Sequence, residues 1–491
     1  MEDVISQEEL PTITGIACDS RKVKPGYAFV AISGFKTDGN KYINEAIENG
    51  ARVIFTDKKL ENTLISKKNI PILQIDDART HLANLAAEYY DYPSNKINLI
   101  GITGTNGKTT TTHLIYNLLN YIKDSFNNKA NKIAGLIGTV HVDTGRKVFP
   151  GDLTTPDPIK LQKYLNEMVN NKLKYACMEV SSHGIKLKRI IGNRFSVKVG
   201  TNISADHFDL HPNFSDYIQV KRNFLEENGD TLVLINHDNK ILRSFGKIAK
   251  RQVNFAINNT TDVVADNIQK WNKGQRFTYR LNRNLSYKGD NIIKPCEISI
   301  NMNLPGNHNI YNALIAITIA LYYKIPGKTI KNFFENFQGI WRRLQFIYDE
   351  NFTIIDDCAH NPGSYEAIFA SILEMNFNRL IIVNSLRGNR GNIINKKNAE
   401  TISKILKEIR NYYFISTNCN DVVKDIDKVN EEEESVFINT LINNNIKFEH
   451  YQFLRPALKR ALNFVSKDDI IVLLGPHAMD NAGEMILQMT D

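Results

Sequence analysis

The residues Gly104-Thr105-Asn106-Gly107-Lys108-Thr109 have the composition and spacing of a phosphate-binding loop. An apolar run over 97–102 precedes them and a periodic segment over 109–119 follows, so we expect a strand, a loop and a helix. In such a loop, backbone N–H groups and the helix N-terminus surround phosphate oxygens, the lysine neutralises their charge and the threonine hydroxyl ligates Mg²⁺. The full Walker spacing is not met, because an isoleucine stands six residues before the lysine. The alternative is a glycine turn with a surface lysine.

Two further side chains follow predicted strands. Glu179 comes at the end of the apolar run 175–180, and His207 lies in 201–209, after the next such run. Open α/β sheets bind ligands at the carboxyl ends of their strands, and a carboxylate beside bound phosphates is a Mg²⁺ ligand. Glu179 could instead pair with a nearby lysine. A lone histidine is more often a structural hydrogen bonder, so only its neighbourhood favours His207 as a ligand.

The segments that must position these residues alternate strands with helices, which predicts an α/β protein. We expect three domains: 1–94, 95–340 and 341–491. A polar, proline-bearing linker over 91–96 ends the first domain, and the pattern restarts after Trp341-Arg342-Arg343. The expected strands are 27–32, 51–55, 97–102, 175–180, 197–201, 231–235, 277–281, 297–304, 352–356, 380–383, 412–416 and 470–474, and the clearest helices are 78–90, 109–119 and 309–323.

Composition excludes several classes of protein. The chain has 491 residues, 42% hydrophobic and 23% charged, and a net charge of +8 without a basic tract, which favours small anionic substrates over nucleic acid. The five cysteines show no CxxC spacing, so neither a disulfide framework nor a zinc site is expected. There is no apolar leader and no long apolar run, so we expect a soluble, cytoplasmic protein. The acidic run Glu431–Glu434 is interpreted as a solvated face or loop.

An ordered set of short motifs along nearly the whole chain resembles the Mur ligases, the ATP-dependent amide ligases of peptidoglycan precursor synthesis. Within that family, the set is most similar to the MurE type, which adds the third amino acid to a UDP-N-acetylmuramoyl dipeptide. The first domain contributes a region similar to the family's uridine-binding segment. The motifs are Cys18–Arg21, Pro25–Ala31, Asp38-Gly39, Gly104–Thr109, Thr154–Pro158, Glu179–His183, Thr201–Asp209, Tyr217–Lys221, Gly306–Asn312, Trp341–Arg343 and Asp357–Pro362.

The resemblance implies a three-domain architecture. An N-terminal domain would bind the UDP-sugar, a central domain with a P-loop ATPase-like parallel sheet would bind ATP, and a C-terminal Rossmann-like domain would close over ATP and bring the amino acid. ATP and two Mg²⁺ ions would be required. The substrates would be UDP-N-acetylmuramoyl-L-alanyl-D-glutamate and an amino acid. No nucleic acid or membrane partner is expected, and a monomer is expected rather than an oligomer.

The resemblance also assigns roles to single residues. Lys221 would be a carbamylated lysine that holds a second Mg²⁺ with Glu179 and His207, although the sequence alone suggests an ordinary helix-surface lysine. The catalytic set would be Lys108, Glu179, His207, Lys221 and Arg343, and the metal ligands Thr109, Glu179, His207 and Lys221. Nucleotide would be bound by Gly104, Thr105, Asn106, Gly107, Lys108, Thr109, Thr110, Asn309, Asn312, Arg343 and Asp357. The muramoyl substrate would be bound by Ser20, Thr154, Thr155, Ser182 and Arg189.

The chain departs from the family pattern in the third domain. MurE-type enzymes carry an Asp-Asn-Pro-Arg-like element and a Gly-Lys-Gly-His-Glu element that shape the amino-acid pocket. Here the corresponding segments are Ser416–Asp421 and Gly475–Asp480, which contain neither Arg nor Lys. A distal carboxylate is usually fixed by a bidentate arginine. We therefore expect a preferred amine other than meso-diaminopimelate, namely a basic or small neutral amino acid, and Asp421 or Asp480 could receive a distal ammonium or hydroxyl.

Two other functions compete with a MurE-like ligase. One is a paralogue of the same catalytic class that acts on a different carboxylate, against which the retained N-terminal domain weighs. The other is a non-catalytic nucleotide-gated binding protein on the same scaffold. Retention of Lys108, Thr109, Glu179, His207 and Lys221 weighs against it, because a scaffold has no reason to keep metal ligands.

Overall fold

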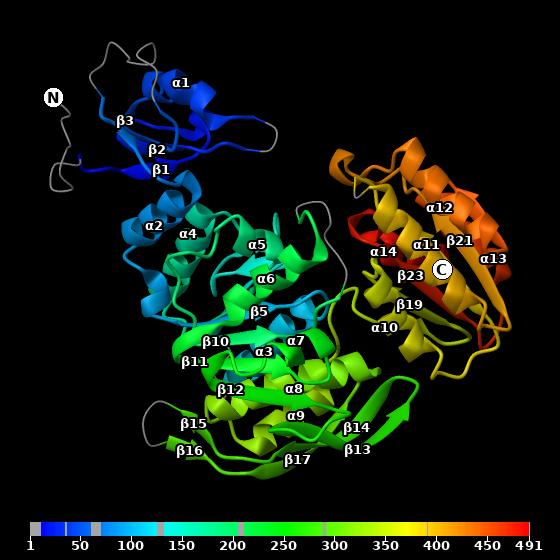
Figure 1. Ribbon diagram of the computed structural model, residues 1–491. Coiled ribbons are helices and arrows are strands. Elements are labelled where there is room, and N and C mark those ends of the chain that lie inside the picture. The colour runs from blue at the N-terminus through cyan, green and yellow to red at the C-terminus, as the bar shows by residue number, and fades with distance from the viewer. Residues whose placement is uncertain are drawn as a thin grey trace. The chain divides into compact units, whose positions relative to one another are not determined.

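The structure is a computed structural model that describes residues 11–34, 37–59, 70–124, 132–204, 211–287, 291–389 and 391–490 (Figure 1). Its described residues form two compact units. The first comprises Met1–Thr103, Lys123–Val199 and Val220–Leu232, and the second comprises Gly104–Ile122, Gly200–Gln219 and Val233–Asp491. The division into three domains at residues 94 and 340 stays a prediction.

The first unit begins with a small four-stranded parallel sheet in the order β1-β2-β3-β4. Its strands bury residues on both faces, because α1 covers one side and α2 the other. Asp77 caps α2 by accepting a hydrogen bond from the backbone N–H of Thr80. The elements are β1 (Gly15–Ala17), β2 (Tyr27–Ala31), α1 (Ile43–Glu48), β3 (Ala51–Thr56), β4 (Ile72–Gln74) and α2 (Ala78–Tyr89).

The same unit contains a second group of strands, hydrogen-bonded in the order β10-β5-β9-β6-β7-β8. The three central strands β5, β9 and β6 run parallel, and Ile102 of β5 pairs in register with Glu179 of β9. This register brings the ends of β5 and β9 to the same edge of the sheet. The elements are β5 (Asn98–Thr103), β6 (Ala134–Ile137), β7 (His141–Asp143), β8 (Val148–Pro150), α4 (Pro158–Asn170), β9 (Tyr175–Glu179), α5 (Ser182–Lys186) and β10 (Val197–Gly200).

Four elements cross between the units along the chain, and the second unit continues with strands in the order β11-β12-β13-β14-β17. The crossing elements are β10, α3 (Lys108–Asp124), α6 (Phe214–Leu225) and β11 (Glu227–Asn236). Helix α8 is buried on nearly every side, as its continuous apolar sequence requires. The other elements are α7 (Lys240–Ser244), β12 (Ala249–Ala256), β13 (Val263–Trp271), β14 (Gly274–Leu281), β15 (Leu285–Tyr287), β16 (Asn291–Ile293), β17 (Cys296–Met302), α8 (Asn307–Tyr322) and α9 (Gly327–Asn336).

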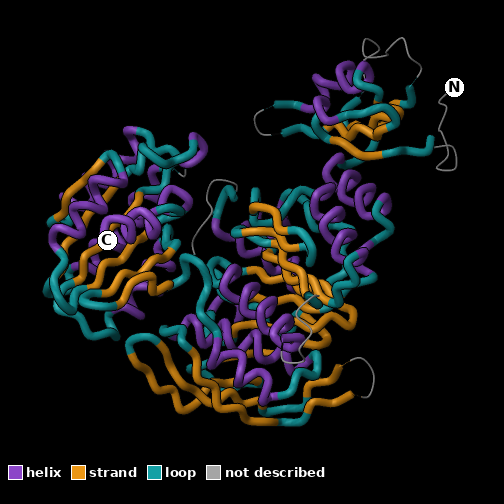
Figure 2. Tube along the Cα trace, turned by 180° about the vertical axis from the view of Figure 1, so that it is seen from behind, coloured by secondary structure: helices purple, strands orange, loops and turns teal. Residues whose placement is uncertain are grey.

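The C-terminal part of the second unit is a six-stranded sheet in the order β18-β19-β23-β20-β21-β22, parallel except for β18. Helices cover both faces of this sheet, as Figure 2 shows, so the expected Rossmann-like arrangement is confirmed. The elements are β18 (Gln345–Asp349), β19 (Thr353–Asp357), α10 (Pro362–Ile372), β20 (Leu380–Ser385), α11 (Asn392–Leu406), β21 (Tyr412–Thr417), α12 (Glu431–Asn443), β22 (Phe448–Tyr451), α13 (Leu454–Phe464), β23 (Ile470–Leu474) and α14 (Ala482–Thr490).

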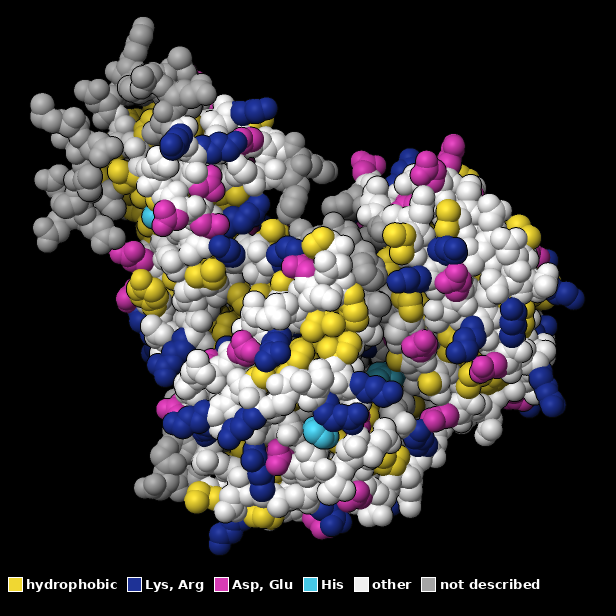
Figure 3. Space-filling model, in the orientation of Figure 1, with side chains coloured by type: hydrophobic (Ala, Val, Ile, Leu, Met, Phe, Trp, Pro, Cys, Tyr) yellow, Lys and Arg dark blue, Asp and Glu magenta, His cyan; other side chains and the backbone are white. Residues whose placement is uncertain are grey.

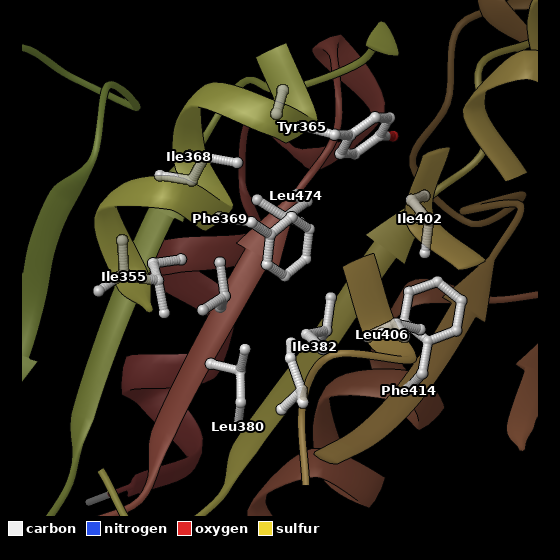
Figure 4. Packing of buried hydrophobic residues seen from close by; sticks show 14 of the residues in the cluster. Ile355, Tyr365, Ile368, Phe369, Leu380, Ile382, Ile402, Leu406, Phe414 and Leu474 are labelled. Atoms are coloured by element: carbon white, nitrogen blue, oxygen red, sulfur yellow. The ribbon is translucent and has the colours of Figure 1, made fainter. Parts of the chain in front are cut away.

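Alternate residues of these strands enter two separate cores. Ile382 and Phe414 pack with Phe369 of α10 and Leu406 of α11 (Figure 4), whereas their neighbours along the strands face α13 and α14. Both faces of each strand are therefore apolar, which explains why the strands appear in the sequence as continuous apolar runs rather than as alternating ones.

The acidic run over 431–434 is not merely a solvated face. Glu431 begins α12, where the negative charges of the first turn favour the helix N-terminus. Glu433 is buried, closes a capping box with Asn430, and accepts hydrogen bonds from the backbone N–H groups of Asn389 and Gly391 at 3.0 and 2.8 Å. One glutamate of the run therefore fixes the loop that follows β20.

We predict that Ile382→Ala destabilises the C-terminal sheet by about 2–5 kcal/mol, because the deleted side chain is fully buried and leaves a cavity. Hydrogen exchange of β20 peptides, followed by mass spectrometry, measures the loss as faster exchange. Ile393→Ala is the matched control, because Ile393 on α11 is 64% exposed, and it should change exchange little. Equal effects from the two variants would contradict the packing described here.

Candidate active site

The segment that follows β10 fixes the loop between β5 and α3 through hydrogen bonds. The backbone N–H groups of Thr105 and Asn106 donate to the carbonyl and the side-chain Oδ1 of Asn202, at 2.8 and 3.0 Å. In return, Thr201 Oγ1 and Asn202 Nδ2 donate to the carbonyl oxygen of Asn106 at 2.7 and 3.0 Å. Thr105 Oγ1 also lies 3.0 Å from the hydroxyl of Tyr217 on α6. The loop therefore has a fixed conformation.

Two glycines of the loop are required by its backbone. Gly104 has φ +154°, and a Cβ atom there would lie 1.9 Å from Thr201 Oγ1. Gly107 has φ +82°, and its Cβ would lie 2.9 Å from Asn312 Oδ1. Both positions combine a conformation that favours glycine with a close approach of a neighbouring side chain.

Lys108 and Thr109 begin α3, as the sequence predicts. Lys108 Nζ donates to the carbonyl oxygens of Gly104 and Thr105, both at 2.9 Å, so the ammonium lies over the loop. Thr109 is buried, and its hydroxyl accepts a hydrogen bond from Arg343 Nη2 at 3.2 Å. The positive charges of Lys108 and Arg343 thus both lie at the N-terminus of α3, where anions are favoured.

A pocket lies beside this loop and contains seven of the residues expected to bind nucleotide. They are Asn106, Gly107, Thr110, Asn309, Asn312, Arg343 and Asp357. Asn106 also contacts Asn361, the N-cap of α10, through reciprocal amide hydrogen bonds at 3.3 and 3.5 Å. The structure therefore brings residues from distant parts of the chain into one concave site.

The sequence interpretation missed other residues of this pocket: Thr201, Asn202, Asn236, His308, Tyr311, Ser364, Ala367 and Ile368. Thr201, Asn202, His308 and Tyr311 stand inside motifs that had been recognised, but their roles had not been assigned. Asn236 ends β11, so its position at the carboxyl end of a strand was the available signal. Ala367 and Ile368 belong to the helix that follows Asn361, and only the fold shows their approach.

The pocket holds groups of different charge. Burial raises the pKa of Asp357, whose Oδ2 accepts a hydrogen bond from the N–H of Leu344 at 2.7 Å, while Arg343 acts in the opposite direction. Burial lowers the pKa of His308 to about 4, so its ring is neutral at pH 7. Asn312 and Asn309 are buried and linked by a hydrogen bond of 3.2 Å. Neutral amides and an imidazole, together with a carboxylate and an arginine, can accept an aromatic base, a sugar hydroxyl and a phosphate.

In the first unit, Glu179 and Lys221 both lie at the carboxyl end of β5. Glu179 is buried and accepts hydrogen bonds from the N–H and the hydroxyl of Thr139 at 2.9 and 3.2 Å. Lys221 is 1% exposed, and its Nζ lies 3.4 Å from Thr103 Oγ1. An ordinary helix-surface lysine would be solvated, so the interpretation of Lys221 from the sequence alone was wrong.

His207 lies outside the described residues. Among the residues that the structure does describe, no group of three or more His, Cys, Asp or Glu side chains is arranged to hold a metal ion. The donors available for Mg²⁺ are the Thr109 hydroxyl and the Glu179 carboxylate, which fit a hard cation. An ammonium cannot ligate a cation, so Lys221 fits only as a carbamate.

The residues expected to bind the muramoyl substrate form one group and one outlier. Thr139 Oγ1 lies 3.0 Å from Thr154 Oγ1, and Arg189 Nη1 donates to the carbonyl oxygen of Thr155 at 2.8 Å. Ser182 is buried at the start of α5, and its hydroxyl has no hydrogen-bond partner within the described part of the chain. Ser20 is the outlier. It lies between β1 and β2 of the small N-terminal sheet, where its hydroxyl donates to Glu45 at 2.9 Å.

The two aspartates expected to receive a distal ammonium are already engaged. Asp421 accepts hydrogen bonds from the N–H groups of Leu454 and Arg455 at 2.7 and 3.2 Å, so it caps α13. Asp480 binds Arg342 Nη1 at 2.7 Å and His477 Nδ1 at 3.2 Å. Both carboxylates therefore contribute to the fold, and their role toward the amine stays a prediction.

The surface matches the charge analysis. On the face shown in Figure 3, Lys and Arg side chains are dispersed among Asp and Glu and do not gather in one patch. Within the described residues, none of the helices is both long enough and apolar enough to cross a membrane.

Three models of Mur ligase domains match successive segments of the chain. The family model "Mur ligase family, catalytic domain" matches residues 12–90, "Mur ligase middle domain" matches 102–320, and "Mur ligase, glutamate ligase domain" matches 342–477. A relative from Clostridium botulinum, named UDP-N-acetylmuramoyl-L-alanyl-D-glutamate--2,6-diaminopimelate ligase, is 32% identical over 96% of this chain and 91% of its own length. A relative of the same name from Oceanobacillus iheyensis is 31% identical over 94% and 89%.

Solved structures share the fold. A structure of a UDP-N-acetylmuramoyl-L-alanyl-D-glutamate--2,6-diaminopimelate ligase has a TM-score of 0.63 at 19% identity and covers 98% of this chain and 96% of its own. MurF ligase from Thermotoga maritima in complex with ADP has a TM-score of 0.62 at 16% identity, with coverages of 98% and 97%.

The phosphate loop and the pocket beside it are typical of an α/β protein that binds a nucleotide. The full-length relatives make the identification narrower: the chain belongs to the Mur ligase family.

We predict that Lys108→Ala lowers ATP-dependent turnover by at least a hundredfold without unfolding the protein, because the ammonium contributes charge to phosphate and not to core packing. ADP release measures turnover, and circular dichroism checks the fold. Lys328→Ala is the matched control, since Lys328 is an exposed lysine in the first turn of α9. Turnover of Lys108→Ala within about tenfold of the unsubstituted protein would contradict the assignment of the loop.

Proposed function

We propose that this protein is the ATP-dependent, ADP-forming ligase that joins an amino acid to UDP-N-acetylmuramoyl-L-alanyl-D-glutamate in peptidoglycan precursor synthesis. The observation that carries the proposal is the pocket in which Arg343 and Asp357 of the C-terminal part meet the phosphate loop. Full-length relatives of about 30% identity, named as ligases of this muramoyl dipeptide, support the carboxylate substrate.

The chemistry requires activation of a carboxylate, which is a poor acylating agent. A carboxylate oxygen of the substrate attacks the γ-phosphorus of ATP, and ADP leaves with an acyl phosphate formed. The amine then adds to the acyl carbon, and the tetrahedral species expels inorganic phosphate to leave an amide. Phosphoryl transfer depends mainly on positioning and on neutralising charge.

The described residues can supply both requirements. Lys108 and Arg343 place two positive charges at the N-terminus of α3, and the backbone N–H groups of the loop add further donors. Thr109 would hold one Mg²⁺, which neutralises phosphate charge when bound. On the base side, His308, Asn309 and Asn312 would contact adenine, and Asp357 can accept hydrogen bonds from ribose hydroxyls.

A second Mg²⁺ would be held by Glu179 and by Lys221 as its carbamate, with His207. The position of Lys221 supports this role, because its buried side chain reaches Thr103 at the carboxyl end of β5, the edge where Glu179 also lies. Carbamylation converts it to an oxygen donor of negative charge, which suits a hard cation. Thr154, Thr155, Ser182 and Arg189 would bind the muramoyl peptide, and Ser20 the UDP-sugar.

The amine is the least defined substrate. The relatives are named for 2,6-diaminopimelate, but the segments Ser416–Asp421 and Gly475–Asp480 contain no arginine or lysine to fix its distal carboxylate. Asp421 and Asp480 also contact α13 and Arg342. A preferred amine other than meso-diaminopimelate stays our prediction, because these two segments lack the family's arginine and lysine.

An amino-acid screen tests the function. With ATP, Mg²⁺ and UDP-N-acetylmuramoyl-L-alanyl-D-glutamate, we expect ADP release that depends on both the dipeptide and one class of amino acid. A kcat/KM for meso-diaminopimelate well above all others would overturn the amine prediction alone. ADP release only with other carboxylates would indicate a paralogue, and no release with any amine would indicate a non-catalytic nucleotide-binding protein.

Carbamylation gives a separate prediction. Lys221→Ala should lose most activity, and short carboxylic acids or added bicarbonate should partly restore it by replacing the carbamate oxygens. Bicarbonate should not restore Lys108→Ala, which serves as the control for non-specific activation. If Lys221→Ala keeps full activity, Lys221 does not belong to the metal site.

A further inference from the structure

Among the residues that the structure describes, Arg342 is the largest fully buried side chain, with 1% exposure. Its guanidinium has five acceptors: Asp356 Oδ1 at 3.0 Å, Asp480 Oδ1 at 2.7 Å, and the carbonyl oxygens of Gly475, Pro476 and Asp357 at 2.6, 3.0 and 3.5 Å. Nearly all hydrogen-bond donors of the planar guanidinium thus have acceptors. A compact lysine ammonium could not reproduce this arrangement.

The backbone of Arg342 is also unusual. Its φ of +51° lies in the left-handed region, which costs a residue with a Cβ atom about 1 kcal/mol or more. A buried guanidinium whose partners were removed would cost more still. The side-chain contacts therefore keep both the charge and the backbone in place, so the conformation of this junction depends on them.

These contacts join three segments of the second unit. They connect residue 342 to the end of β19, at Asp356 and Asp357, and to the loop after β23, at Gly475, Pro476 and Asp480. Asp480 is held on its other oxygen by His477. Burial acts to raise the pKa of Asp480, but the His477 hydrogen bond and the Arg342 charge keep it below its usual value.

Both chain neighbours of this network line the nucleotide pocket. Arg343 follows Arg342, and Asp357 follows Asp356. The two segments are further connected by Cys358 N–H, which donates to the carbonyl of Arg342 at 3.0 Å, and by Leu344 N–H, which donates to Asp357 Oδ2 at 2.7 Å. Any shift of Arg342 would consequently move the guanidinium of Arg343, which donates to Thr109, and the carboxylate of Asp357.

We propose that Arg342 is a positioning residue. Its buried guanidinium sets Arg343 and Asp357 in the nucleotide pocket and connects them to the loop Gly475–Asp480 at the carboxyl edge of the C-terminal sheet. Arg342 itself does not line the pocket and acts through its neighbours. The proposal rests on the proposed function only where ligation is the readout, because nucleotide binding can be measured without ligation.

The test measures the dissociation constant of Mg-ADP by calorimetry on the full chain, together with the thermal midpoint and the ligation kinetics. For Arg342→Lys we expect ADP binding weakened at least tenfold, because a point charge cannot hold all five acceptors. For Asp356→Asn, which keeps the shape and one acceptor, we expect about threefold to tenfold weakening. Asp356→Asn keeps the proposal testable if Arg342→Lys fails to fold.

Arg379→Lys is the matched control. Arg379 and Asp469 immediately precede β20 and β23 and pair at 2.8 Å; Arg379 is 25% exposed and does not line the pocket. It should lower the thermal midpoint and leave the ADP dissociation constant within twofold.

The outcomes separate a positioning role from a purely structural one. If Arg342→Lys and Asp356→Asn behave like Arg379→Lys, with lowered thermal midpoints and unchanged ADP affinity, Arg342 is only structural and the proposal is overturned. If the unsubstituted protein binds Mg-ADP but shows no ligation with any donor, the proposed function fails, while the ADP data still decide the role of Arg342.

Discussion

The site depends on the close approach of the phosphate loop to the segment after β10. Gly104 lies so near Thr201 that no side chain fits between them, and the loop's peptide groups exchange hydrogen bonds with Asn202. This contact fixes the direction in which the chain leaves β5 and enters α3. The placement of Lys108 and Thr109 at the start of α3 follows from it. A loop without this support would have to be ordered by the ligand, at a cost in binding free energy.

Much of the fold could be predicted because the strands are short apolar runs bounded by polar turns. β23 was expected at its observed bounds, and β2, β20 and β21 were expected within two residues of theirs. The phosphate loop was recognisable since its chemistry is local, and strand, loop and helix occur within some twenty residues. The nucleotide-side residues could be gathered from distant motifs only through the family resemblance.

Other features depend on tertiary contacts that local patterns do not show. The acidic run resembles a solvated surface in the sequence, yet Glu433 is buried because two N–H groups of the loop after β20 require an acceptor. Asp421 contacts the N-terminus of α13 and Asp480 contacts Arg342, and the sequence shows neither contact. In the sequence Lys221 resembles a surface lysine, because a helical pattern does not indicate that a charged side chain will be buried.

The most direct test of the account follows one oxygen atom. The muramoyl dipeptide is labelled with ¹⁸O in its carboxylates, and the inorganic phosphate released during ligation is analysed by mass spectrometry. If a substrate carboxylate attacks the γ-phosphorus, one ¹⁸O atom passes to phosphate for each amide formed. Phosphate without label, with amide formed at the same rate, would contradict carboxylate activation at this site.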